Sequence, residues 1–172
     1  GCIERVNLAT GKAERLYDQV EGVALKGPND IVFDVDGGFW FTDLGKVREH
    51  DMDRGGVFHA RIDGRTAQVV AHPVMTPNGI ALSPDGHTLY VAETEGARLW
   101  AFDVDGPGRV HKQPWPSPHG ARMVVAAPGG HYQRFDSMAV DALGNILVAT
   151  LLHGGINVVS PGVIDTPMMP LQ

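Results

Sequence analysis

Short segments of alternating apolar and polar residues, separated by glycine and proline, run along the whole chain. Alternation with a period of two is typical of β-strands. Glycine occurs 22 times and proline 12 times, and the longest stretch without either runs only from His131 to Leu143. Helices of ordinary length therefore have little room, and the pattern predicts an all-β protein. The clearest strand segments are residues 31–33, 39–41, 57–59, 89–91, 99–102 and 146–148.

Three segments of the chain repeat one another: residues 29–43, 78–92 and 136–150. Each is predicted to be a strand, a tight turn and a second strand, and their spacing is close to the ~40–50 residues of a four-stranded propeller blade. We therefore expect a β-propeller domain over residues 1–162, as an incomplete arc of about three blades of four-stranded antiparallel sheets. An irregular tail is expected over 163–172.

The sequence also predicts the roles of several segments that connect strands. The Asp-x-Asp-Gly sequences at 34–37 and 103–106 are interpreted as hairpin turns rather than calcium loops, because they lack the spaced ligands and final glutamate of an EF-hand. The proline-rich segment 107–128 is interpreted as an excursion between blades. The polar segment 46–54 is either a loop over the channel mouth or inert surface.

Asn29, Asn78 and Asp136 begin the first strand of the three repeats. First strands of propeller blades line the central channel, so these side chains are expected on one face near the axis. Two amide carbonyls and a carboxylate suit a hard cation such as calcium. The alternative is structural, because Asn and Asp also begin strands and form turns.

The sequences around these three residues resemble one family. Gly27-Pro28-Asn29-Asp30, the segment 76–86 beginning Thr-Pro-Asn-Gly, and the segment 135–141 are similar to the gluconolactonase/regucalcin (senescence marker protein) family of six-bladed propellers. The resemblance covers roughly Ile3 to Pro161. It implies a channel-bound divalent metal with Asn78 and Asp136 as ligands, Asp136 also as general base, and Asn29 as a metal or substrate contact. The family's glutamate ligand belongs to a blade expected before Gly1.

The resemblance implies a hydrolase that opens a sugar lactone or a related cyclic ester with the help of this metal. Calcium is favoured by the oxygen ligands, with zinc, manganese and magnesium as alternatives. Asn29, Asp30 and Asp43 are expected substrate contacts, although turn or loop roles would also explain the two aspartates. Glu93 and His153 are weaker candidates of the same kind. Two other functions stay open: a non-catalytic propeller that binds a ligand or protein, and an inactive fragment of such an enzyme.

Composition narrows the partners. Lysine and arginine number 14 against 20 aspartates and glutamates, and no basic cluster is present, which argues against nucleic acid. Cys2 is the only cysteine, which excludes an internal disulfide and a thiolate zinc site. No apolar run approaches the ~20 residues of a membrane span. We expect a small lactone as the partner, no membrane, and a cytoplasmic location, with the oligomeric state open.

Overall fold

The computed structural model describes residues 1–126 and 132–161, and within them the regular structure is almost entirely β-strand. The chain begins with a β-hairpin. A second antiparallel pair of strands, each two residues long, follows it. The four strands involved are β1 (Ile3–Val6), β2 (Ala13–Tyr17), β3 (Gln19–Val20) and β4 (Val23–Ala24).

Three larger antiparallel sheets follow in chain order. The first blade contains β5 (Pro28–Phe33), β6 (Gly38–Asp43), β7 (Gly55–Arg61) and β8 (Ala67–Val74). The second blade contains β9 (Pro77–Leu82), β10 (Thr88–Glu93), β11 (Arg98–Gly106), β12 (Arg109–His111), the 3₁₀ turn η1 (Pro118–Gly120) and β13 (Arg122–Ala126). The third sheet contains β14 (Phe135–Val140), β15 (Ile146–Thr150) and β16 (Gly155–Val159).

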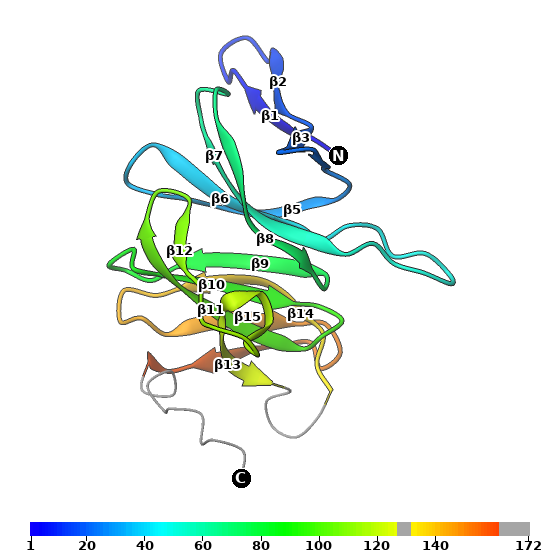
Figure 1. The fold of residues 1–172 in the computed structure, drawn as a ribbon, viewed down its shortest axis with the longest axis vertical. Helices are drawn as coiled ribbons and strands as arrows, with labels where there is room; N and C mark the ends of the chain where they lie inside the picture. Colours follow the sequence, from blue (N-terminus) through cyan, green and yellow to red (C-terminus); the bar gives the residue numbers. More distant parts are fainter. Residues whose placement is uncertain (127–131, 162–172) are drawn as a thin grey trace.

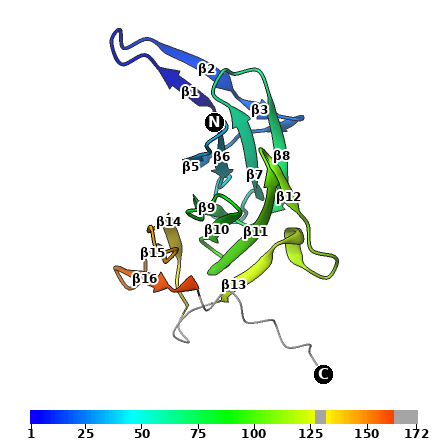
Figure 2. The same cartoon turned by 90° about the vertical axis from the view of Figure 1, so that its left-hand side faces the viewer.

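The sheets follow one another along the long axis of the molecule, with the β1–β2 hairpin at one end and β14–β16 at the other (Figures 1 and 2). The first strands of neighbouring sheets lie together, so that β9 is flanked by β5 on one side and β14 on the other. Repeated antiparallel sheets with adjacent inner strands are the architecture of a β-propeller. The prediction of an all-β arc of about three blades is confirmed.

Apolar side chains fill the space between successive sheets. Trp40, Val57 and Val70 of the first blade pack against Ile80 and Trp100 of the second. A second cluster joins the second and third sheets, and a third joins the first blade to the chain before it. The first and second blades therefore bury both faces against their neighbours, whereas the third sheet packs through the cluster that it shares with the second blade.

The same turn closes the first hairpin of each blade. Gly37, Gly86 and Gly144 occupy equivalent positions with φ between 73° and 83°, a conformation that favours glycine. In the first and third blades an aspartate starts the turn. Asp34 Oδ1 accepts the N–H groups of residues 36 and 38, and Asp141 Oδ1 accepts those of residues 143 and 145, all at 2.8–2.9 Å.

Two predictions about connecting segments are wrong. Residues 103–106 do not form a turn, because β11 continues to Gly106. Of segment 107–128, the described residues 107–126 are not an excursion between blades, because β12 pairs with one half of β11 and β13 with the other half; residues 127 and 128 lie outside the described residues. The two short strands thus share the outer edge of the second blade, which the nine residues of β11 are long enough to provide.

The expected boundary at residue 162 and the tail at 163–172 lie outside the described residues. Within the described part of the chain, no helix is long and apolar enough to cross a membrane.

Candidate metal and substrate site

A β-bulge occurs at the same place in all three blades. Between Pro28 and Ile31, three residues of β5 advance against two of β6. The same mismatch occurs in β9 from Pro77 to Ile80, and in β14 from Phe135 to Met138. Bulges redirect side chains and are frequent beside active sites. The bulged residues include Asn29, Asn78 and Asp136, so each of these polar side chains leaves the regular alternation of its strand at an equivalent point.

The bulges of β9 and β14 bring two of the three predicted residues into contact. Asn78 Nδ2 donates a hydrogen bond to Asp136 Oδ1 at 2.9 Å and a second one to Thr94 Oγ1 at 3.0 Å. Thr94 is buried, and its hydroxyl donates in turn to the Phe135 carbonyl at 2.8 Å. The Asn78 amide group is therefore held in one orientation from two sides.

This orientation leaves the amide oxygen of Asn78 without a partner. Asn78 is 4% exposed, and its Oδ1 atom is buried and accepts no hydrogen bond from the residues that the structure describes. A buried acceptor without a donor is unfavourable unless something else satisfies it. A cation beside Oδ1 and the Asp136 carboxylate would do so, and the donor set fits an oxygen-preferring divalent metal.

Among the described residues, no cluster of three or more histidine, cysteine, aspartate or glutamate side chains could hold a metal. The candidate site contains one amide oxygen, from Asn78, and one carboxylate, from Asp136. A site of this composition does not include three side chains of those four types.

Close backbone approach makes the contact between β9 and β14 feasible. A Cβ atom added at Gly79 would lie 2.5 Å from the Asp136 carbonyl oxygen and 2.9 Å from the Met138 backbone nitrogen. Only glycine fits this gap without moving one strand, so Gly79 sets the distance between the strands that carry Asn78 and Asp136.

Asn29 occupies the equivalent position in β5 but is not part of this contact. It is exposed and makes no side-chain hydrogen bond with the described residues. Its neighbour Asp30 ties β5 to β9, because its carboxylate accepts the Ile31 and Ile80 backbone N–H groups at 2.9 and 3.2 Å. Asp30 thus supports β9, the strand that carries Asn78.

Asp43 has a different place from the one expected of a substrate contact. It is 3% exposed, and its carboxylate accepts the backbone N–H groups of Lys26, Gly27 and Gly45 at 2.6–2.8 Å. Three donors already occupy the carboxylate, which therefore holds the loops around the end of β6 together. We leave Asp43 out of the candidate site.

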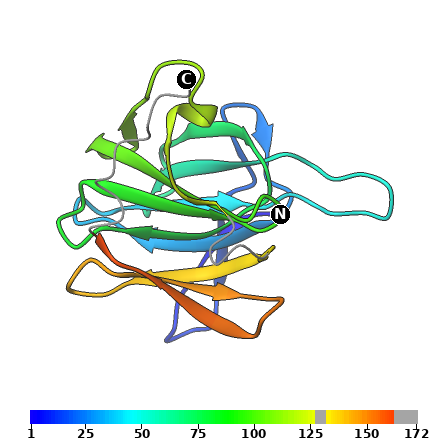
Figure 3. The same ribbon diagram turned by 90° about the horizontal axis from the view of Figure 1, so that it is seen from below.

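The remaining candidates are not brought together. Glu93 is buried beside Arg98, and His153 lies in the turn between β15 and β16. The segment 46–54 is a hairpin-like loop that projects beyond the sheets (Figure 3). Lys26 and Arg48 both form ion pairs with Asp53 in this loop, which hold the pKa of that carboxyl well below its usual range.

Thr42 and Thr94 are supporting residues that the sequence analysis did not identify. Thr42 is buried, and its hydroxyl donates to the Asn78 carbonyl at 2.6 Å and accepts the Asp30 N–H at 3.2 Å. A hydroxyl residue stands at or next to the end of each second strand, as Thr42, Thr94 or Thr150. The three threonines stand at different registers relative to the inner strands, so the repeats gave no signal for their roles.

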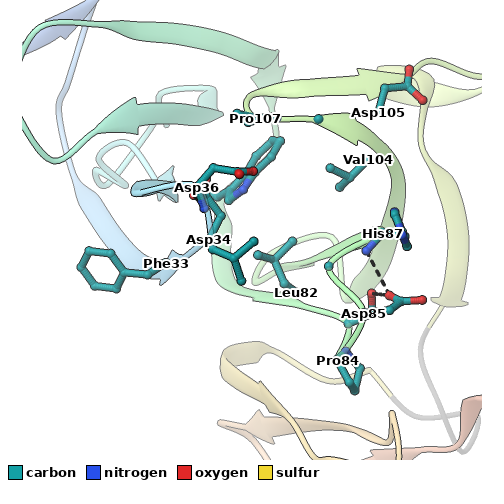
Figure 4. Close-up of a pocket in the computed structure, with 15 residues that line it drawn as sticks. Phe33, Asp34, Asp36, Leu82, Pro84, Asp85, His87, Val104, Asp105 and Pro107 are labelled. Carbon is teal, nitrogen blue, oxygen red and sulfur yellow. Dashed lines mark hydrogen bonds between the residues drawn. The ribbon is translucent and has the colours of Figure 1, made fainter.

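A separate cavity of about 410 Å³ lies at the opposite ends of the strands, among the hairpin turns of the first two blades (Figure 4). Several carboxylates line it, but those of Asp34 and Asp85 are already occupied. Burial opposes the ionised form of Asp34, yet hydrogen bonds from His59 and two backbone N–H groups hold its pKa below the ordinary value. Asp85 accepts the Ser83 hydroxyl and the His87 N–H. These groups stabilise turns, so the cavity is not the candidate site.

Comparison with known proteins gives consistent relatives. A family model described as "SMP-30/Gluconolactonase/LRE-like region" matches residues 2–169. Diisopropyl-fluorophosphatase of Loligo vulgaris is 33% identical over 91% of this chain and 52% of its own length. Gluconolactonase of Zymomonas mobilis is 29% identical over 93% of this chain and 46% of its own length. Lactonase drp35 of Staphylococcus aureus is 32% identical over 86% of this chain and 43% of its own length.

Solved structures agree with this fold. A gluconolactonase from Xanthomonas campestris superposes with a TM-score of 0.66 at 27% identity, covering 93% of this chain and 56% of that one. Regucalcin from Agrobacterium tumefaciens, described as a calcium-binding protein, gives a TM-score of 0.69 at 22% identity. The superposition covers 92% of this chain and 50% of that one. The chain thus spans about half the length of the relatives that it matches.

Proposed function

The chain belongs to the SMP-30/gluconolactonase/LRE-like family, and from this premise we propose that it forms part of a metal-dependent hydrolase that opens a sugar lactone or a related cyclic ester. Asn78 and Asp136 would hold the metal, with Asn29 as a further metal or substrate contact. The observation that carries the proposal is the buried Asn78 Oδ1 atom, which has no hydrogen-bond partner among the described residues, on a side chain whose Nδ2 atom contacts the Asp136 carboxylate.

A divalent cation, when bound, supplies Lewis-acid polarisation of a carbonyl group and makes a bound water more acidic. The chain's own residues do the rest. Asn78 presents its amide oxygen in a fixed direction because Thr94 and Asp136 hold its nitrogen. Asp136 accepts the proton of the water that adds to the lactone carbonyl. As the ring C–O bond breaks, Asp136 returns this proton to the leaving ring oxygen, which becomes a hydroxyl group. The carboxylic acid formed on the same molecule then releases its own proton to solvent and becomes a carboxylate.

Oxygen ligands favour calcium, and the regucalcin structure to which the chain is similar is described as calcium-binding. Zinc, manganese and magnesium remain alternatives in this proposal, since amide and carboxylate oxygens also bind these ions.

A calorimetric calcium titration tests the metal site. We expect saturable binding to the chain and its loss in Asp136→Ala. Asp105→Ala is the matched control, because Asp105 is an exposed aspartate at the far end of β11. Calcium binding that survives in Asp136→Ala, or disappears equally in the control, would contradict the proposed ligand set.

Chelator-sensitive hydrolysis of gluconolactone tests the activity. The expected result is acid release that stops on addition of a chelator and is absent in Asp136→Ala. Lactone hydrolysis unchanged in that variant would remove Asp136 from the role of base.

A second substrate class follows from the 33% identity with diisopropyl-fluorophosphatase. A cation held by the same residues would polarise a phosphoryl oxygen in place of a carbonyl oxygen. Fluoride release from diisopropyl fluorophosphate, measured beside acid release from gluconolactone, decides between the two classes.

A further inference from the structure

A cavity of about 610 Å³ opens between the first two blades, on the side of η1 and the Pro114–Pro118 segment. Its size lies within the ~300–1,000 Å³ typical of small-molecule sites. None of its lining residues is Asn29, Asn78 or Asp136, so it is separate from the candidate metal site. All of its walls come from the first two blades and their loops.

The lining of this cavity contains two buried polar atoms that have no hydrogen-bond partner within residues 1–126 and 132–161. Glu93 is 1% exposed, and Arg98 Nη1 lies 3.2 Å from its Oε2 atom, but its Oε1 atom makes no hydrogen bond. His119 Nε2 is 3.7 Å from Oε1. Trp100 is 3% exposed, and its indole N–H also has no acceptor. One acceptor and one donor in this corner are thus left unsatisfied.

Positive charge exceeds negative charge around the cavity. Arg54, Arg98 and Arg122 line it, against the single carboxylate of Glu93. Arg98 is paired with Glu93, and Arg122 with Asp103 at 2.8 Å. In the described part of the chain Arg54 forms no ion pair, and it is exposed at the rim. Its guanidinium is available to an anion.

The same cavity is lined by flat apolar surface. Trp115 is 90% exposed, an unusual position for a side chain of this size, and Met75 and Met123 line the same cavity. An exposed aromatic ring in a cavity that an unpaired arginine also lines suits a ligand with a ring and a negative charge.

We infer that this cavity binds an aromatic hydroxycarboxylate. The carboxylate would pair with Arg54, the ring would pack on Trp115, and the hydroxyl would supply the hydrogen-bonding capacity that Glu93 and Trp100 lack. The carboxylate, the ring and the hydroxyl group of this ligand are each inferred from a different observation. Each inference can therefore be tested separately, with an analogue that lacks the group or a variant that lacks its partner.

The test uses mandelate and two analogues, titrated by calorimetry into the 172-residue chain. Mandelate carries the ring, the hydroxyl and the carboxylate; phenylacetate lacks the hydroxyl, and 1-phenylethane-1,2-diol lacks the charge. We expect saturable binding of mandelate, binding of phenylacetate weaker by about fivefold, and binding of the diol weaker by about tenfold or more. Calcium and lactone are absent, so the result is independent of the proposed hydrolysis.

Two exposed positions supply the variants. Arg54→Gln should weaken mandelate binding by about tenfold and leave binding of the uncharged diol unchanged. Trp115→Ala should weaken all three ligands. Arg65→Gln is the matched control, because Arg65 is exposed and lies outside the cavity.

Circular dichroism of each variant checks that the fold is kept. No saturable mandelate binding below a Kd of about 10 mM would overturn the inference. Equal affinity for mandelate and the diol, or an equal loss in Arg54→Gln and Arg65→Gln, would overturn it as well.

Discussion

The orientation of one amide group decides what the candidate metal site can offer. An asparagine side chain presents either its oxygen or its nitrogen to a given direction, and the two ends have opposite chemistry. In Asn78 the nitrogen is held by Thr94 Oγ1 and Asp136 Oδ1, which directs the oxygen elsewhere. Thr94 is therefore a positioning residue for a ligand that it does not itself provide.

Replacing Thr94 by valine removes one acceptor of the Asn78 amide. We expect calcium affinity to fall by about fivefold to tenfold, since a buried hydrogen bond contributes about 1 kcal/mol. Thr94→Ser keeps the hydroxyl and should restore the affinity. Calorimetry measures the affinity and thermal unfolding the stability. A variant that unfolds earlier but binds calcium with unchanged affinity would show that Thr94 only supports the fold.

Residues of the same type were not equally predictable. Asn78 and Asp136 could be placed together from the sequence, because equivalent positions of a radial repeat lie on one face. Asp43 could not, because its role depends on the approach of the Lys26–Gly27 and Gly45 backbones, which no local pattern records. The cavity beside Trp115 is set by how β12 and β13 share β11, and it was also beyond prediction.

At the scale of elements, one hairpin design is used three times. Its turn needs a glycine with positive φ, and its bulge sets the polar residue at the start of the inner strand. The Asp-x-Asp-Gly sequence occurs at 34–37 and again at 103–106, and it shows that a repeated sequence does not always form the same structure. The two sequences are alike, yet β11 continues through the second because β12 is available to pair with it.

Asp34 makes the first hairpin sensitive to acid. Its pKa is lowered in the folded chain, so its ionised form stabilises the fold above the ordinary value of 3.8, and this stabilisation is lost as the pH falls through and below that value. Asp34→Asn should lower the unfolding free energy at pH 7 by about 1–2 kcal/mol, and by less at pH 3.

Urea unfolding at both pH values measures the effect. The exposed Asp36 of the same turn gives the matched control, Asp36→Asn. A stability difference for Asp34→Asn that is the same at pH 7 and pH 3 would contradict the role of its charge.

Gly79 links the bulge in β9 to the neighbouring blade. Gly79→Ala would place a Cβ atom 2.5 Å from the Asp136 carbonyl and force β9 and β14 apart. We expect a loss of about 1–3 kcal/mol in stability and weaker calcium binding.

Gly155→Ala is the comparison for Gly79→Ala, because its Cβ would meet only Thr150 Oγ1, at 4.0 Å. Unfolding and calcium titrations of the two variants in parallel measure both effects. If the two variants had the same stability and the same calcium affinity, the close approach of β9 to β14 would not matter.

At the scale of the whole molecule, both ends of the arc present apolar side chains to solvent. Val6 on β1 is 52% exposed at one end, and Ile156 and Val158 are 67% and 61% exposed at the other. Apolar faces of this kind, next to unpaired strand edges, favour association.

We expect the 172-residue chain to associate as its concentration rises, and the double variant Ile156→Lys, Val158→Lys to do so less. Multi-angle light scattering over a concentration series measures the mass. The exposed pair Glu4→Lys, Glu14→Lys on the β1–β2 hairpin controls for added charge alone. A constant monomer mass for the unmodified chain would show that the faces do not drive association.

The shared outer edge of the second blade has an evolutionary consequence. Because β12 and β13 are each anchored to β11, the segment between them can lengthen, shorten or change composition while the blade stays paired. That segment carries Trp115 and His119, whereas Asn78 and Asp136 stand on the inner strands β9 and β14. Ligand preference and metal chemistry can thus diversify independently, and exchanging residues 112–121 between relatives would transplant one without the other.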